Sequence, residues 1–82
     1  MSKLEKLLEK MRNPDATWSW DDLCSLLVKL DYKQIEGRGS RVKFDNGKPE
    51  DLINLHRPHP SNEMKSYAIE QVRSKLENGG ML

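Results

Sequence analysis

The chain has 82 residues, of which 35% are apolar and 33% are charged, and its formal net charge is +1. This length predicts one domain with a thin hydrophobic core, and the near-neutral charge excludes a uniformly basic nucleic-acid-binding protein. The single cysteine excludes an internal disulfide, the charged first residues do not resemble a signal sequence, and no apolar run could cross a bilayer, so we expect a cytoplasmic protein.

A short apolar stripe predicts an N-terminal helix within an accessory segment, residues 1–13. Its residues follow the i, i+3, i+4, i+7 spacing of one helix face: Leu4, Leu7, Leu8 and Met11. Pro14 ends this helix because proline has no amide hydrogen for the next turn. We expect the stripe to cover either the body of the same domain or a partner.

A second helix is predicted from the residue after Ser19. Ser19 and Asp22 have the spacing of a capping box. The apolar face of this helix is broad and predicts the main core helix: Trp20, Leu23, Leu26, Leu27 and Leu30. Cys24 lies beside this face, and a lone thiol there is more often a packing residue than a nucleophile.

Three short strands are predicted next, at about residues 32–36, 40–44 and 52–57, with Ile35 pointing inward in the first. The glycines at 37 and 39 permit a reversal into the second strand, and Asp45-Asn46-Gly47 is a second turn signal. The pattern therefore predicts an antiparallel meander.

Alternation along the second and third of these strands predicts two different faces. The apolar residues share one face: Val42, Phe44, Ile53 and Leu55. His56 then shares the other face with Arg41 and Lys43. Residues 33–43 contain four cations and one acidic residue, so this face is either an anion-binding surface or an edge kept basic against aggregation.

A final helix is predicted after Pro58-His59-Pro60, with Ser61 or Asn62 as its cap. Its apolar stripe contains Met64, Ala68, Ile69, Val72 and Leu76, and Gly79-Gly80 follows its end. Helices on one face of an antiparallel sheet give an α+β, two-layer fold. The uncovered sheet face is then the available site.

Several of these residues carry a resemblance to a known family. Gly39-Ser40 before an alternating strand that ends at Phe44, then a strand that leads to His59-Pro60 and a last helix, resembles the HicA family of bacterial toxins over residues 19–80. The resemblance implies a double-stranded-RNA-binding-domain-like α-β-β-β-α fold, an mRNA interferase activity and a HicB antitoxin partner. Many members of that family have a catalytic histidine directly after the Gly-Ser pair, where this chain has Arg41.

Metal-free RNA cleavage requires a base for the 2′-hydroxyl, an acid for the leaving oxygen and cations for the phosphate. Histidine suits the first two roles because its ordinary pKa lies near neutrality. We expect His56, and as second choice His59, to be catalytic, and we expect RNA contacts from Arg38, Ser40, Arg41, Lys43 and Arg57. Because the sequence shows no metal-ligand or phosphate-loop motif, we expect no metal and no cofactor.

Two other functions are compatible with the same residues. One is a non-catalytic RNA-binding or protein-interaction module of the same fold, and the other is a helical adaptor that binds proteins through the stripe from Leu4 to Met11. The expected partners of the leading hypothesis are mRNA and an antitoxin protein, with no membrane and no small-molecule cofactor.

Overall fold

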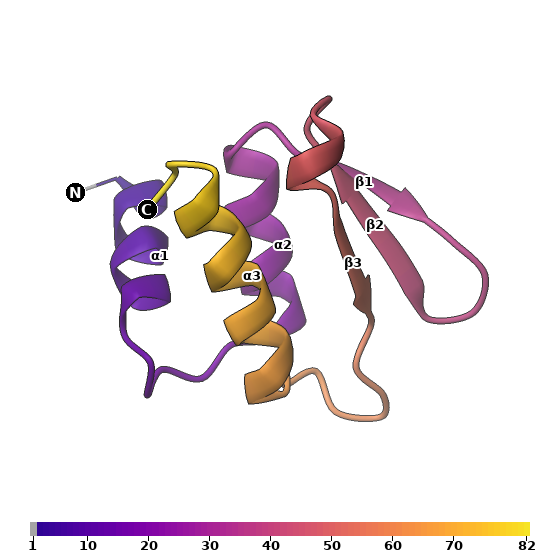
Figure 1. The fold of residues 1–82 in the computed structure, drawn as a ribbon. Helices are drawn as coiled ribbons and strands as arrows, with labels where there is room; N and C mark the ends of the chain where they lie inside the picture. The colour runs from indigo at the N-terminus through magenta and orange to yellow at the C-terminus, as the bar shows by residue number, and fades with distance from the viewer. Residues whose placement is uncertain (1) are drawn as a thin grey trace.

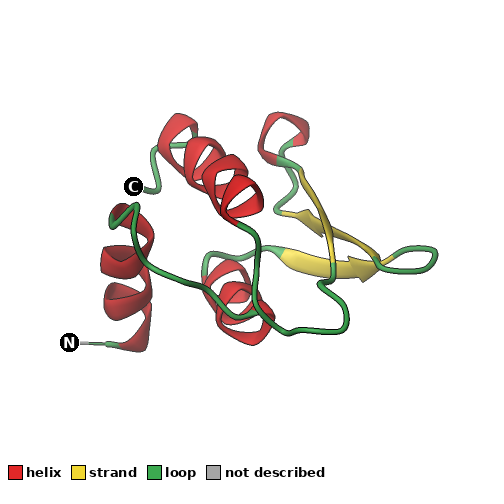
Figure 2. Ribbon diagram, turned by 90° about the horizontal axis from the view of Figure 1, so that it is seen from below, coloured by secondary structure: helices red, strands yellow, loops and turns green. Residues whose placement is uncertain are grey.

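The computed structural model describes residues 2–82 and contains three α-helices, a three-stranded antiparallel sheet and a short 3-10 helix. In chain order the elements are α1 (Lys3–Arg12), α2 (Trp20–Lys29), β1 (Lys33–Glu36), β2 (Arg41–Asp45), η1 (Pro49–Asp51), β3 (Ile53–His56) and α3 (Ser66–Asn78). The strand order is β1-β2-β3. Helices α2 and α3 cover one face of the sheet, and α1 lies on the side of these helices away from the sheet (Figures 1 and 2). The predicted α+β fold is therefore confirmed, with α1 as an additional helix.

Helix α1 packs onto the rest of this chain through its predicted stripe. Leu7 and Met11 are buried in the same core as the residues of α2 and α3, and Leu4 and Leu8 pack at its edge. The guanidinium of Arg73 on α3 donates to the carbonyl of Met11 at 2.6 Å, which satisfies a group that has no partner within α1. The stripe therefore covers the body of its own chain.

Helix α2 begins as predicted. The hydroxyl of Ser19 accepts a hydrogen bond from the backbone amide of Asp22 at 3.1 Å. Trp20 is 5% exposed, and its ring lies 6.0 Å from that of Phe44 on β2. This aromatic contact joins the start of α2 to the covered face of the sheet.

The four predicted inward residues of β2 and β3 are buried, between 0% and 4% exposed: Val42, Phe44, Ile53 and Leu55. They face each other in register, with Val42 opposite Leu55 and Phe44 opposite Ile53. This half of the sheet follows the alternation of its sequence.

The prediction for Ile35 is wrong. Ile35 is 45% exposed and lies opposite Lys43, and residues directly opposite each other share a face of the sheet. Glu36 instead lies opposite the buried Val42. All four residues of this short edge strand are exposed.

Both predicted turns are present. Gly39 has a φ of 62° in the β1–β2 turn, and Gly47 has a φ of 92° in the β2–β3 connection, which is a conformation that glycine adopts at little cost. The side chain of Asp45 accepts from the amide of Gly47 at 2.8 Å. The 3-10 helix η1 lengthens this connection and was not predicted.

The predicted start of the last helix is also wrong. Helix α3 begins at Ser66, with Lys65 as its N-cap residue and no side-chain cap, whereas the composition favoured Ser61 or Asn62. The carbonyl of Asn62 accepts from the amide of Trp20 at 2.8 Å, and the amide of Met64 donates to the carbonyl of Trp18 at 2.7 Å. These bonds hold residues 62–64 beside the start of α2, where Glu63 forms an isolated β-bridge with Ser19. The stripe from Ala68 to Leu76 is buried as predicted.

Within residues 2–82, none of the helices combines the length and the apolar character that crossing a membrane requires.

Candidate functional site

The open face of the sheet presents an imidazole beside two cations. Arg41 lies directly opposite His56 in the β2–β3 register, and Lys43 lies opposite Asn54. All four side chains are on exposed positions that alternate with the buried ones. The strand register therefore brings Arg41, Lys43 and His56 together on one face, as the alternation predicted.

This face is hollowed. A depression of about 460 Å³, which we call the open-face hollow, follows β2 and β3. Its lining comes from the β1–β2 turn and the two strands: Gly37, Arg38, Arg41, Val42, Lys43, Asn54, Leu55 and His56. Three of the predicted RNA-contact residues thus surround one depression with His56 at its border.

The charge of the open-face hollow is positive. Among residues 2–82 the ion pairs are Lys10 with Asp22 and Arg57 with Glu36, so its three cations, Arg38, Arg41 and Lys43, take part in none. Cations without a partner carboxylate are available to phosphate oxygens.

Ser40 contacts the ring of His56. The carbonyl of Ser40 accepts from the amide of Arg57 at 2.7 Å, which extends the β2–β3 ladder by one bond and holds the turn against the end of β3. As a result the hydroxyl of Ser40 lies 3.2 Å from Nδ1 of His56. A hydroxyl can donate or accept, so Ser40 can bind Nδ1 of either neutral tautomer of the imidazole. When Nδ1 carries the proton and donates to Ser40, Nε2 has the lone pair that a base needs.

Arg57 does not line the open-face hollow, although its amide is bonded to Ser40 and it lines a neighbouring depression with Ser40 and His56. Its guanidinium donates to the carboxylate of Glu36 at 2.7 Å and lies 5.7 Å from the centre of the Trp20 ring. Both partners belong to the covered side of the sheet. The structure therefore does not bring Arg57 together with Arg41 and Lys43.

His59 borders a different depression. This second one, of about 350 Å³, lies between the end of β3, the segment after it and the start of α3, and we call it the turn hollow. Ser40, His56, His59, Lys65 and Tyr67 are among its lining residues. His56 lines both hollows, whereas His59 lines only the turn hollow.

Lys65 was not singled out from the sequence. It borders the turn hollow because residues 62–64 are bonded to the segment around Trp18 and Trp20, so that Lys65 stands at the start of α3. A helix starting at residue 61 or 62 would have placed it on a helical turn. Its position depends on the hydrogen bonds of residues 62–64 with the segment before α2, and no pattern in the local sequence indicates those bonds.

Cys24 has the chemistry of a packing residue. The thiol is half-buried, and burial, followed by the nearby carboxylate of Asp21, raises its pKa to about 11. The thiol is therefore protonated at neutral pH and is a poor nucleophile. Within residues 2–82, no three acidic, histidine or cysteine side chains are grouped so that they could hold a metal ion.

Comparison with known proteins identifies the family. The family model described as the HicA toxin of bacterial toxin-antitoxin systems matches residues 20–80. No curated protein and no solved structure gave a significant match. The matched range contains the whole sheet, α2, α3 and both hollows, and it covers well over half of the chain. On this match, the chain belongs to the HicA toxin family.

Proposed function

We propose that this protein is the toxin of a type II toxin-antitoxin pair and that it binds and cleaves mRNA without a metal ion. The observation that carries the proposal is the register of β2 and β3, which places Arg41 directly opposite His56 beside an exposed Lys43. An imidazole next to unpaired cations supplies a group for proton transfer and the positive charge that metal-free cleavage of an RNA phosphodiester uses.

In this proposal the RNA backbone lies along the open-face hollow. Arg41 and Lys43 hold the phosphate and offset the negative charge that builds on it. His56 takes the proton of the 2′-hydroxyl, whose oxygen attacks the adjacent phosphorus while the bond to the 5′-oxygen breaks. The leaving oxygen receives a proton from an acid, and His59 across the turn hollow is the candidate for it. The products are a 2′,3′-cyclic phosphate and a 5′-hydroxyl.

Membership of a toxin-antitoxin family implies an antitoxin partner. We expect a HicB-like protein that covers the open-face hollow and supplies carboxylates to Arg38, Arg41 and Lys43. Such a complex would exclude RNA from the site, and the action on mRNA places the pair in the cytoplasm.

A non-catalytic RNA-binding module is the second candidate. Arg41 occupies the position where the family resemblance implies a catalytic histidine, and it favours binding over cleavage. This candidate predicts the same interface and the same salt dependence of RNA affinity, without strand scission.

One assay separates the two candidates. The purified full chain is incubated with single-stranded and with structured RNA, with and without a chelator. We expect cleavage that resists the chelator and is abolished in the variant His56→Ala, while His59→Ala retains part of it. RNA binding without any cleavage would establish the binding module, and cleavage that is unchanged in His56→Ala would remove His56 from the mechanism.

A further inference from the structure

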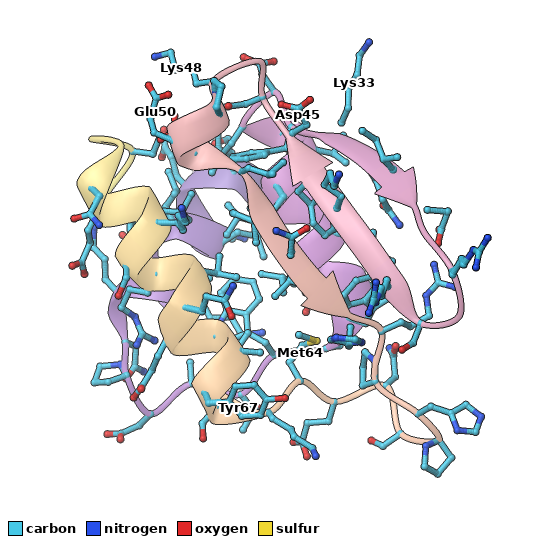
Figure 3. The ribbon with its side chains drawn as sticks, turned by 45° about the vertical axis from the view of Figure 1, so that its right-hand side comes forward. Lys33, Asp45, Lys48, Glu50, Met64 and Tyr67 are labelled. Carbon is cyan, nitrogen blue, oxygen red and sulfur yellow. The ribbon has the colours of Figure 1, made fainter. Side chains whose placement is uncertain are left out.

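The turn hollow contains an aromatic residue that packing does not explain. Tyr67 is 67% exposed, although its neighbours Ala68 and Ile69 are buried in the core. Figure 3 shows its side chain at the end of α3 that adjoins the loop from β3, with Met64 nearby. The hydroxyl of Tyr67 takes part in no hydrogen bond within the described residues. An exposed ring of this size is available to a ligand.

The ring stands between two depressions. Tyr67 lines the turn hollow on one side, and on the other it lines a shallow depression that reaches residues 14–18. Met64 and Ala68, each 8% exposed, give the turn hollow an apolar floor. A flat apolar surface beside polar groups suits a planar heterocycle, whose faces are apolar and whose edges form hydrogen bonds.

The charges of the two hollows differ. The open-face hollow is lined by Arg38, Arg41 and Lys43 without an acidic residue. In the turn hollow, Glu63 accompanies Lys65, and the guanidinium of Arg57 is already paired with Glu36. The carboxylate of Glu63 disfavours a phosphate there but not a neutral base. Phosphates therefore belong to the open-face hollow and a base to the turn hollow.

We propose that the turn hollow binds one unpaired base of a single-stranded RNA, with the ring of Tyr67 as its stacking surface. His56 lines both hollows, so a nucleotide whose phosphate lies at His56 and Arg41 can place its base beside Tyr67. Ser40 and Lys65 offer hydrogen bonds to the edge of that base. This inference rests on the proposed function, and it adds a subsite that selects unpaired strands, because a base inside a duplex has no free face.

The test is the affinity of the full chain for a short 2′-O-methyl RNA, which cannot be cleaved because it lacks the attacking hydroxyl. We expect Tyr67→Ala to weaken binding by roughly tenfold, the range expected when one base no longer stacks on a ring. Tyr67→Phe keeps the ring and should retain the affinity. The matched control is Val28→Ala, which removes another exposed apolar side chain, 53% exposed, from α2.

Two further readouts identify the interaction. Because Tyr67→Ala removes no charge, the slope of log affinity against log salt should stay at the wild-type value. An oligonucleotide with abasic positions has no base to stack on the ring, so it should bind Tyr67→Ala and the parent protein with equal affinity. If it binds the parent protein tenfold more tightly than Tyr67→Ala, the ring contacts something other than a base and the proposal is overturned.

The outcomes separate this inference from the function on which it rests. If Tyr67→Ala binds RNA with the affinity of the parent protein, the base subsite is overturned and the proposed function stays intact. If that variant binds RNA normally but is no longer neutralised by an antitoxin, the ring belongs to a protein interface. Absence of RNA binding by the parent protein overturns both. Loss of binding in Arg41→Ala with no change in Tyr67→Ala supports the proposed function alone.

Discussion

Phe44 and Ile53 lie opposite each other on the covered face of the sheet and have no exposed surface. The next pair along the two strands, Lys43 and Asn54, lies on the open face in solvent. The same two strands thus build a core on one side and a cationic surface on the other. Because alternate side chains point to opposite faces, a substitution on one face need not disturb the other. We therefore expect changes of the covered face to alter stability, and changes of the open face to alter RNA binding.

The largest effect is expected from Phe44→Ala on the covered face. Phe44 is fully buried against Trp20, so truncation removes apolar packing and leaves a cavity. We expect the free energy of unfolding to fall by about 3–5 kcal/mol, which is a large part of the stability of a small domain. Urea denaturation followed by circular dichroism measures it. A decrease below about 1 kcal/mol would show that this face is not the core.

The double variant Arg41→Ala/Lys43→Ala tests the open face. We expect its stability to stay within about 0.5 kcal/mol of the parent, because both side chains are exposed. RNA affinity should fall, and the slope of log affinity against log salt should flatten by about 0.7 for each phosphate of a single strand that the variant no longer neutralises. Fluorescence polarisation over a salt series measures both quantities.

A matched control removes two cations elsewhere. Lys6→Ala/Lys29→Ala changes the net charge by the same amount on the exposed surfaces of α1 and α2. An equal loss of affinity and an equal change of slope in the two double variants would mean that overall charge, and not the open face, determines RNA binding.

The same conservative change on each face gives a sharper comparison. Ile53 has no exposed surface, whereas Ile35 is 45% exposed on the open face. We expect Ile53→Val to cost about 0.5–1.5 kcal/mol of unfolding free energy, as for a buried methylene, and Ile35→Val to cost less than about 0.5 kcal/mol. Equal costs in denaturant melts would show that β1 buries Ile35 in solution.

The smallest effect concerns Cys24, on the helical side of the sheet. Burial raises the pKa of its thiol from 9.0 to about 11, so iodoacetamide should react slowly at pH 8 and roughly tenfold faster for each pH unit up to about 11. Because the thiol ionises at a lower pH in the unfolded chain than in the folded protein, its protonation favours the folded state. This contribution of Cys24 to the free energy of unfolding is complete below pH 9 and is lost as the pH rises toward 11. The variant Cys24→Ala should therefore lose less stability than the parent between pH 9 and pH 11. A thiol that titrates near 9 in the folded protein would contradict the burial.

The positions of these residues could be predicted to different degrees. The faces of β2 and β3 followed from strict alternation, because each strand has two apolar residues that fix its parity. Strand β1 has Ile35 as its one aliphatic residue, and a single residue does not fix which face is inward. The register with β2 determines which residues of β1 lie on the open face, and that register depends on the turn at Gly37 and Gly39.

The parts of the site that could not be predicted depend on contacts between distant segments. Ser61 and Asn62 have the composition of a helix cap, but the carbonyl of Asn62 is bonded to the amide of Trp20, which is far earlier in the chain. The contact of Ser40 with His56 joins residues 16 positions apart and needs the strand register. The ion pair of Arg57 with Glu36 also depends on the sheet, because it joins the residue after β3 to the end of the edge strand β1.

The central claim is that the open face of the sheet binds RNA, and the most direct measurement is an NMR titration of the ¹⁵N-labelled full chain with a 2′-O-methyl RNA. We expect the largest shifts of amide signals in residues 38–43 and 54–57, with small shifts in α1 and along the exposed side of α2. Saturable shifts that cluster on α1 or α2 while the signals of Arg41, Lys43 and His56 stay in place would contradict the account.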